Sequence, residues 1–128
     1  MNKTKMIFVR HGQSEANLSG IFVGHINSPL TELGHRQAEM TAEFLKDEKI
    51  DAFYGSDLIR AYETGRHIAK RHNKEVIPDK NLREIYAGEW EGKKFSDLPG
   101  LYEKTFSVWL SDIGRSHPDG GESVLELY

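Results

Sequence analysis

The sequence predicts a layered α/β fold, and three observations support this prediction. A short apolar run, Met6-Ile7-Phe8-Val9, is typical of a buried strand, and similar short runs follow at 50–54 and 74–77. Segments with apolar residues at near-helical spacing separate these runs. No repeat, linker or shift in composition divides the chain, and 128 residues is a common size for one domain. We therefore expect residues 1–128 to form a single domain in which strands and helices alternate.

The first strand is expected to end at Val9-Arg10-His11-Gly12, which places Arg10 and His11 at its carboxyl tip. Ligands of open α/β sheets bind at the carboxyl ends of strands. Arginine presents a planar fork of donors that matches phosphate oxygens, and neutral histidine is a nucleophile near physiological pH. The pair therefore offers both anion binding and chemistry, although an isolated Arg-His pair at a strand end is more often a solvated terminus.

A glycine-rich loop over 12–29 is expected to lead into a helix over 31–46. Thr31 has the side chain of an N-cap residue. Apolar residues at near-helical spacing then predict one buried face, formed by Leu33, Ala38, Ala42 and Leu45. The strand over 50–54 follows this helix.

A turn at 55–57 is expected to cap a second helix that runs to about Arg71. Arg60 lies in the first turn of this helix. Free N–H groups and the helix dipole favour anions at such a position, so Arg60 fits a phosphate site. An isolated arginine there is more often an ordinary exposed residue, and the functional interpretation depends on Arg10.

A strand over 74–77 is expected to stop at Pro78, and an irregular segment follows over 81–92. A partly helical segment over 95–113 is expected to be interrupted at Pro99-Gly100. A turn over 118–123 then opens a last helix over 124–128. Glu84 lies in the irregular segment, from which a general acid can reach a cleft. It is one of 20 acidic residues, and taken alone it is expected to be solvated.

Composition excludes several classes of function. The net charge is −3, and the basic residues are scattered, so we expect no nucleic acid and no membrane as partners. The absence of cysteine excludes disulfides, zinc–thiolate sites and thiol catalysis, and it favours a cytoplasmic location. Only four apolar residues stand between the N-terminal segment 1–5 and Arg10, too few for a signal peptide or a membrane span. The histidines lack the spacing of metal ligands, so we expect no metal and no cofactor.

Five motifs, which occur in the same order along the chain, resemble those of the histidine phosphatase superfamily, also called the phosphoglycerate mutase-like family. They are Arg10-His11-Gly12-Gln13-Ser14 with Asn17, Ser28-Pro29-Leu30-Thr31-Glu32-Leu33-Gly34, Ser56-Asp57-Leu58-Ile59-Arg60-Ala61, Leu82-Arg83-Glu84 and Gly120-Gly121-Glu122-Ser123. The resemblance implies a three-layer α/β/α architecture with a mostly parallel central sheet. It also implies a phosphomonoesterase whose partner is a small phosphorylated metabolite.

The resemblance assigns roles to the residues singled out above. His11 would attack the phosphoryl group and form a phosphohistidine. Arg10, Arg60 and Asn17 would hold the equatorial oxygens and spread the developing charge without a metal ion. Glu84 would protonate the leaving alkoxide and then accept a proton from the attacking water. This role requires a protonated Glu84 near neutral pH, which burial and the adjacent phosphate dianion would favour.

The same resemblance implies a substrate pocket beside the phosphate site. Gln13, Ser14, Val23 and Gly24 are expected to line this pocket. Val23 stands where many relatives carry a polar residue, so this wall departs from the usual pattern.

Three functional alternatives remain open at this stage. The short interval after Glu84 and the segment Gly88-Glu89-Trp90-Glu91-Gly92 favour the phosphatase branch over a phosphoglycerate mutase. Family members also carry a second pocket histidine on a strand downstream of the Gly-Gly-Glu-Ser motif, and the chain reaches Tyr128 without it. We therefore also consider an impaired chain that only binds phosphorylated ligands. The fold is expected to be incomplete at the C-terminus, which leaves a homo-oligomer open.

Overall fold

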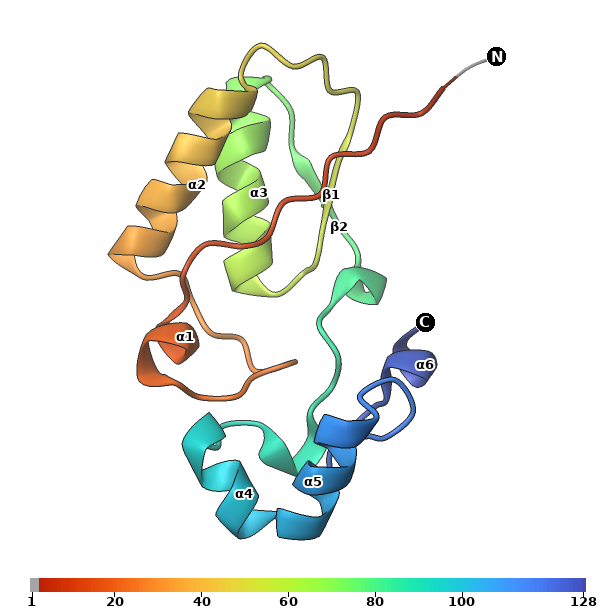
Figure 1. Ribbon diagram of the computed structural model, residues 1–128. Coiled ribbons are helices and arrows are strands. Elements are labelled where there is room, and N and C mark those ends of the chain that lie inside the picture. The colour runs from red at the N-terminus through yellow and green to blue at the C-terminus, as the bar shows by residue number, and fades with distance from the viewer. Residues whose placement is uncertain (1–2) are drawn as a thin grey trace.

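The computed structural model describes residues 3–128 and contains a helical pair packed on a small sheet and a group of shorter helices (Figure 1). The elements are α1 (Glu15–Ser19), α2 (Glu32–Leu45), β1 (Phe53–Gly55), α3 (Ile59–Arg71), β2 (Val76–Pro78), the 3-10 turns η1 (Lys80–Leu82), η2 (Gly88–Trp90) and η3 (Phe95–Asp97), then α4 (Leu98–Leu101), α5 (Glu103–Ser111) and α6 (Val124–Leu127). No helix within residues 3–128 is long and apolar enough to cross a membrane.

The sheet consists of β1 and β2, which pair in parallel with Phe53 opposite Val76. Helix α3 connects the two strands and packs on both, as the crossover of a parallel pair requires. The two strands predicted over 50–54 and 74–77 are thus confirmed, with boundaries shifted toward the C-terminus. Pro78 forms the last residue of β2 instead of following it, because an edge position needs no further N–H donor.

The predicted buried strand over 6–9 is wrong for the described chain. Residues 3–13 belong to no helix or strand, and Figure 1 shows them as a long trace. Met6 is 70% exposed and Phe8 is 86% exposed. Within the described residues β1 and β2 pair only with each other, so this apolar run has no ladder partner and no covering layer.

Helix α2 begins as the sequence predicts, with the Thr31 hydroxyl accepting from the Gly34 amide at 3.0 Å. Its buried face differs by one position at the start, because Gly34 is buried whereas Leu33 is 43% exposed. The reason is a close approach of the backbone: a Cβ on Gly12 would lie 2.4 Å from the Gly34 carbonyl oxygen. This contact holds the segment that carries His11 against the start of α2.

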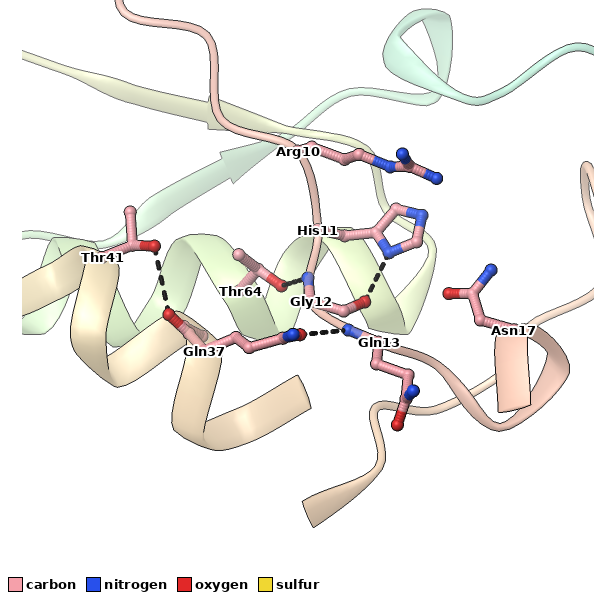
Figure 2. A pocket seen from close by; sticks show the side chains of 9 residues that line it. Arg10, His11, Gly12, Gln13, Asn17, Gln37, Thr41 and Thr64 are labelled. Carbon is pink, nitrogen blue, oxygen red and sulfur yellow. Dashed lines mark hydrogen bonds between the residues drawn. The ribbon is translucent and has the colours of Figure 1, made fainter. Parts of the chain in front are cut away.

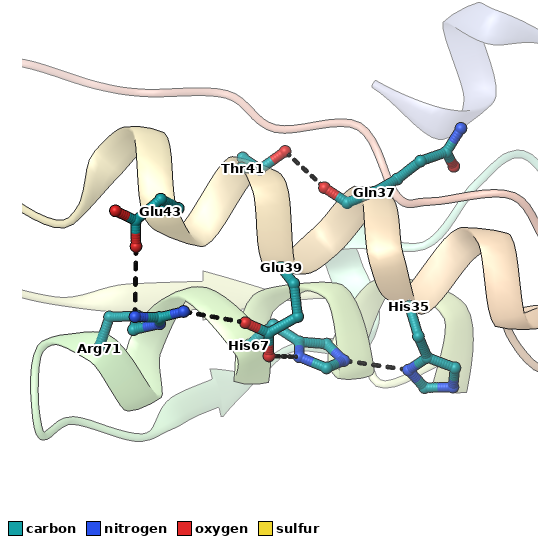
Figure 3. A network of polar contacts seen from close by, with 7 residues as sticks. All are labelled: His35, Gln37, Glu39, Thr41, Glu43, His67 and Arg71. Atoms are coloured by element: carbon teal, nitrogen blue, oxygen red, sulfur yellow. Dashed lines mark hydrogen bonds and ion pairs between the residues drawn. The ribbon is translucent and has the colours of Figure 1, made fainter.

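Helices α2 and α3 share a small apolar core and a set of charged contacts. Ala42, Leu45 and Ile68 are buried together, with Phe53 packed against them. On the outside lies the cross-helix network, which consists of His35, Glu39, Glu43, His67 and Arg71 (Figure 3). His67 donates from Nδ1 to Glu39 at 2.5 Å, and its Nε2 lies 3.0 Å from Nδ1 of His35.

A second, aromatic core lies under the C-terminal helices. Trp90 is fully buried among Ala87, Leu98 and Phe106, and Trp109 packs against this group. The predicted break at Pro99-Gly100 is wrong, because proline is tolerated in the first turn of α4, and the helical segment is interrupted instead at Tyr102, between α4 and α5.

Candidate active site

One cavity of about 500 Å³ brings together the polar residues that the sequence singled out. Arg10, His11, Asn17, Arg60 and Glu84 all line it, and the charges of Arg10, Arg60 and Glu84 act on His11, which places these groups together at one end. They come from the segment before α1, from α1 itself, from the first turn of α3 and from the segment after η1. Figure 2 shows Arg10, His11 and Asn17, which also line the neighbouring cavity drawn there. We call this space the His11 cavity.

The imidazole of His11 is held in one tautomer. Its Nδ1 lies 2.7 Å from the Gly12 carbonyl oxygen, and a carbonyl can only accept, so Nδ1 carries the proton (Figure 2). Burial lowers the pKa of His11, and the positive charges of Arg60 and Arg10 lower it further. The ring is therefore neutral near pH 7, with the lone pair on Nε2 available to an electrophile.

Arg60 is a buried cation that forms no direct ion pair with another described residue. Only 4% of it is exposed, and its guanidinium donates to the carbonyl oxygens of Gly24 at 2.7 Å and Ile26 at 2.9 Å. No carboxylate in the described part of the chain lies within ion-pair distance of it. Burial lowers its pKa, although the negative charges of Glu84 and Glu91 act in the opposite direction, and a guanidinium stays protonated in proteins. A buried charge that meets only neutral acceptors favours an incoming anion.

The loop that holds Arg60 is itself fixed by Glu91. The Glu91 carboxylate accepts backbone hydrogen bonds from Gly24 at 2.9 Å, His25 at 2.7 Å and Ile26 at 3.2 Å. A Cβ on Gly24 would lie 1.9 Å from the Ile85 carbonyl oxygen, so only glycine fits this approach. The Gly24 carbonyl is thereby aimed at the guanidinium.

The segment that carries Glu84 is tied to the start of α3. Arg83 forms a two-pronged ion pair with Asp57, with distances of 2.7 and 2.6 Å. His25 Nε2 donates to the Glu84 carbonyl oxygen at 2.9 Å. The Glu84 side chain accepts from the Ile85 amide and is exposed, so the burial that we expected around it is absent.

The four residues expected in a substrate pocket lie in different places. Val23 lines the His11 cavity, whereas Gly24 is not among its lining residues and instead accepts from Arg60 through its carbonyl. Gln13 lines a neighbouring cavity of about 380 Å³ instead. Ser14 is fully buried and caps α1, where its N–H and hydroxyl both donate to Asn17 Oδ1 at 2.9 Å. This capping box leaves the Asn17 amide nitrogen as the donor of that side chain.

Sequence reasoning missed the residues that position the site. Asp57 and Arg83 belong to the recognised motifs, and their neighbours Arg60 and Glu84 were singled out instead. His25 and Glu91 carry no local signal for this role, because the contacts that join them to the segments of Glu84 and Gly24 span 59 and 67 positions. Among residues 3–128 no group of three or more His, Asp or Glu side chains is arranged to hold a metal ion. Arg10 and Arg60 are the cationic side chains among the described residues that line this cavity.

The site is that of an α/β protein in which a neutral histidine and two arginines line one cavity. The chain belongs to the histidine phosphatase superfamily (branch 1), whose family model matches residues 6–128. The chain is 36% identical over 124 residues to phosphoserine phosphatase 1 of Hydrogenobacter thermophilus, covering 97% of this chain and 59% of that protein. It is 44% identical over 98 residues to the 2,3-bisphosphoglycerate-dependent phosphoglycerate mutase of Thermoplasma acidophilum, covering 75% and 49%.

Solved structures show the same fold. The alpha-ribazole phosphatase from Shigella flexneri superposes with a TM-score of 0.85 at 31% identity, covering 93% of this chain and 59% of that one. The described helices and parallel sheet therefore form an α/β fold of the phosphoglycerate mutase-like type. The chain spans a little over half the length of this structure and of the phosphatase it matches.

Proposed function

We propose that this chain is a phosphomonoesterase that forms a phosphohistidine at Nε2 of His11 and acts on a small phosphorylated metabolite. The observation that carries the proposal is the buried guanidinium of Arg60, which donates only to backbone carbonyls, on the same cavity as a neutral histidine. A phosphoryl group satisfies both features at once, because its oxygens neutralise the cation and its phosphorus accepts the imidazole lone pair.

In the first half-reaction, Nε2 of His11 attacks phosphorus and the bond from phosphorus to the ester oxygen breaks. The bond from Nδ1 to the Gly12 carbonyl keeps the ring oriented during attack. Arg10, Arg60 and the Asn17 amide nitrogen donate to the equatorial oxygens, where negative charge accumulates. Glu84 transfers its proton to the departing alkoxide, which leaves as an alcohol.

In the second half-reaction, the Glu84 carboxylate accepts a proton from water, and the resulting hydroxide equivalent attacks the phosphohistidine. The phosphorus–nitrogen bond breaks, inorganic phosphate departs and Glu84 is protonated again. The proposed reaction needs no metal ion, since arginines carry the compensating charge.

Hydrolysis is favoured over a mutase reaction by the exposure of Glu84. A mutase must keep its phosphohistidine from water until an acceptor hydroxyl returns, whereas the Glu84 carboxylate is open to solvent. The mutase alternative rests on the similarity to the phosphoglycerate mutase named above. A mutase would transfer the phosphoryl group to an added alcohol without releasing an equivalent of phosphate.

The test is release of inorganic phosphate from para-nitrophenyl phosphate in the presence of EDTA. We expect turnover by the chain and none by the His11→Gln variant. His35→Gln is the matched control, because it changes a histidine of the cross-helix network instead. Equal turnover by the chain and His11→Gln would refute the proposal, and binding of phosphate without turnover would support the binding-only alternative.

A further inference from the structure

The His11 cavity continues beyond the phosphate end along an apolar wall. The wall is formed by side chains from segments far apart in the sequence, namely Ile21, Val23, Phe95, Trp109, Ile113 and Leu127. The first two follow α1 and Phe95 lies in η3. Trp109 belongs to α5, Ile113 follows it, and Leu127 belongs to α6. A volume of about 500 Å³ is within the range of small-molecule sites.

The wall is anchored to the aromatic core. The ring of Trp109 packs at 5.5 Å from Trp90 and at 6.2 Å from Phe22, with both pairs edge to face. Phe22 in turn stacks on Phe95 at 5.9 Å. Because Trp90 is fully buried, these contacts fix the Trp109 ring before any ligand arrives.

The charges of the cavity are confined to its phosphate end. Among the described residues that line the cavity, those that titrate or carry charge are Arg10, His11, Arg60 and Glu84, and all four have roles in the proposed reaction. A substrate that carries a second carboxylate would bury it against the wall without a cationic partner. Such desolvation is unfavourable, whereas an aromatic ring gains from losing its contact with water there.

We propose, resting on the phosphomonoesterase function above, that the preferred substrate is a monoester whose alcohol part carries an aromatic or largely apolar group. The phosphate lies between Arg10, Arg60 and His11, and the ring lies against Trp109 and Ile113. Small phosphorylated hydroxy acids are poor substrates on this account, since their carboxylate meets no positive charge beyond the phosphate end.

Calorimetry with non-hydrolysable phosphonates tests this proposal without turnover. Ethylphosphonate, 2-phenylethylphosphonate and 3-phosphonopropionate share one head group and differ in the tail. We expect the phenyl group to tighten Kd by about ten- to a hundred-fold over ethyl, the range for burying one aromatic side chain. We expect the carboxylate to give no gain. Equal Kd values for the phenyl and ethyl compounds, or the tightest binding by 3-phosphonopropionate, would overturn the proposal.

A pair of variants locates the ring. Ile113 is 46% exposed and lines the cavity, whereas Leu110 is 56% exposed and does not. Ile113→Lys is expected to abolish the phenyl preference and to tighten 3-phosphonopropionate, and Leu110→Lys is expected to change neither. A phenyl preference that survives Ile113→Lys unchanged would contradict the assigned position.

Hydrolysis of 2-phenylethyl phosphate and ethyl phosphate separates this proposal from the function on which it rests. The two esters have similar leaving groups, so a difference in kcat/KM reports the tail. Faster turnover of the phenyl ester supports both proposals, and equal turnover refutes the substrate class alone. If the phosphonates bind in the expected order but neither ester is hydrolysed, the phosphatase function fails and the ligand class stands.

Discussion

Two clusters in this molecule contain the same three kinds of charged or titratable side chain and use them in opposite ways. The cross-helix network joins a histidine, an arginine and a glutamate directly: His67 and Arg71 both bond to Glu39. In the His11 cavity the same residue types line one space, yet Arg60 bonds only to backbone carbonyls. In the first cluster the charged side chains pair directly with one another, whereas in the second the Arg60 guanidinium forms no direct ion pair.

The difference shows which charges stabilise the fold and which await a ligand. Partly exposed ion pairs contribute little to stability, so the cross-helix network stabilises the packing of α2 on α3 only slightly. A buried cation that lacks an ion-pair partner destabilises the fold, and a bound anion offsets this cost. Matched substitutions in the two clusters separate these roles.

The largest difference is expected between the two histidines. His11→Gln should reduce kcat toward the roughly 10⁶-fold loss that follows removal of a covalent nucleophile, because no other Nε2 faces the cavity end in the described chain. His35→Gln should leave kcat within about twofold. Steady-state hydrolysis of para-nitrophenyl phosphate measures both, and a comparable loss in the two variants would erase the contrast.

The two arginines come next. Arg60→Ala should reduce kcat by about a hundred- to a thousand-fold, the effect of losing one charge-stabilising donor. Phosphate or vanadate at a hundred times its Kd should stabilise the parent chain by about 2.7 kcal/mol and so raise its Tm. The Arg60→Ala variant should lose this rise in Tm. Arg71→Ala is the control and should retain that rise. Anion-dependent Tm values in Arg60→Ala that match the parent chain would mean that Arg60 does not contact the anion.

The two glutamates differ in their dependence on the leaving group. Glu84→Gln should slow alkyl phosphates by about a hundredfold and para-nitrophenyl phosphate far less, because a good leaving group needs little protonation. Glu39→Gln should slow neither ester. Rates on the paired substrates provide the measurement, and equal slowing of both by Glu84→Gln would count against the acid role.

The pKa of His11 is expected to depend on whether an anion occupies its cavity. Burial and the nearby arginines lower the pKa of His11, so its NMR titration should have a midpoint below that of an ordinary histidine. Bound phosphate should move the midpoint upward, since the anion offsets the arginine charges. An unchanged midpoint on adding saturating phosphate would show that the anion lies elsewhere.

The smallest effect is expected from the cross-helix network. Hydrogen bonds from His67 and Arg71 lower the pKa of Glu39, so its contribution to stability is present above its ordinary pKa and is lost as the pH falls through the lowered value. Glu39→Gln should therefore destabilise the fold at neutral pH by about 0.2–1 kcal/mol. Urea unfolding at neutral and acidic pH checks this, and a loss that grows on acidification would have the wrong sign.

Local patterns predicted the parts of this molecule that local forces decide. Thr31 caps α2 as expected, the turn before α6 is present, and so are the strands on either side of α3. The apolar run at 6–9 failed as a predictor, because a strand depends on a distant partner that periodicity does not reveal. Arg60 and His11 were found from their types and positions, whereas the carboxylate of Glu91 acts through backbone contacts more than 60 positions away.

The central claim is that Nε2 of His11 accepts a phosphoryl group. Rapid acid-free quenching of the chain with a ³²P-labelled ester, followed by peptide mapping, tests it most directly. The account predicts an acid-labile, base-stable label on His11 that His35→Gln retains and His11→Gln loses. A label on another residue, or hydrolysis that continues in His11→Gln, would contradict it.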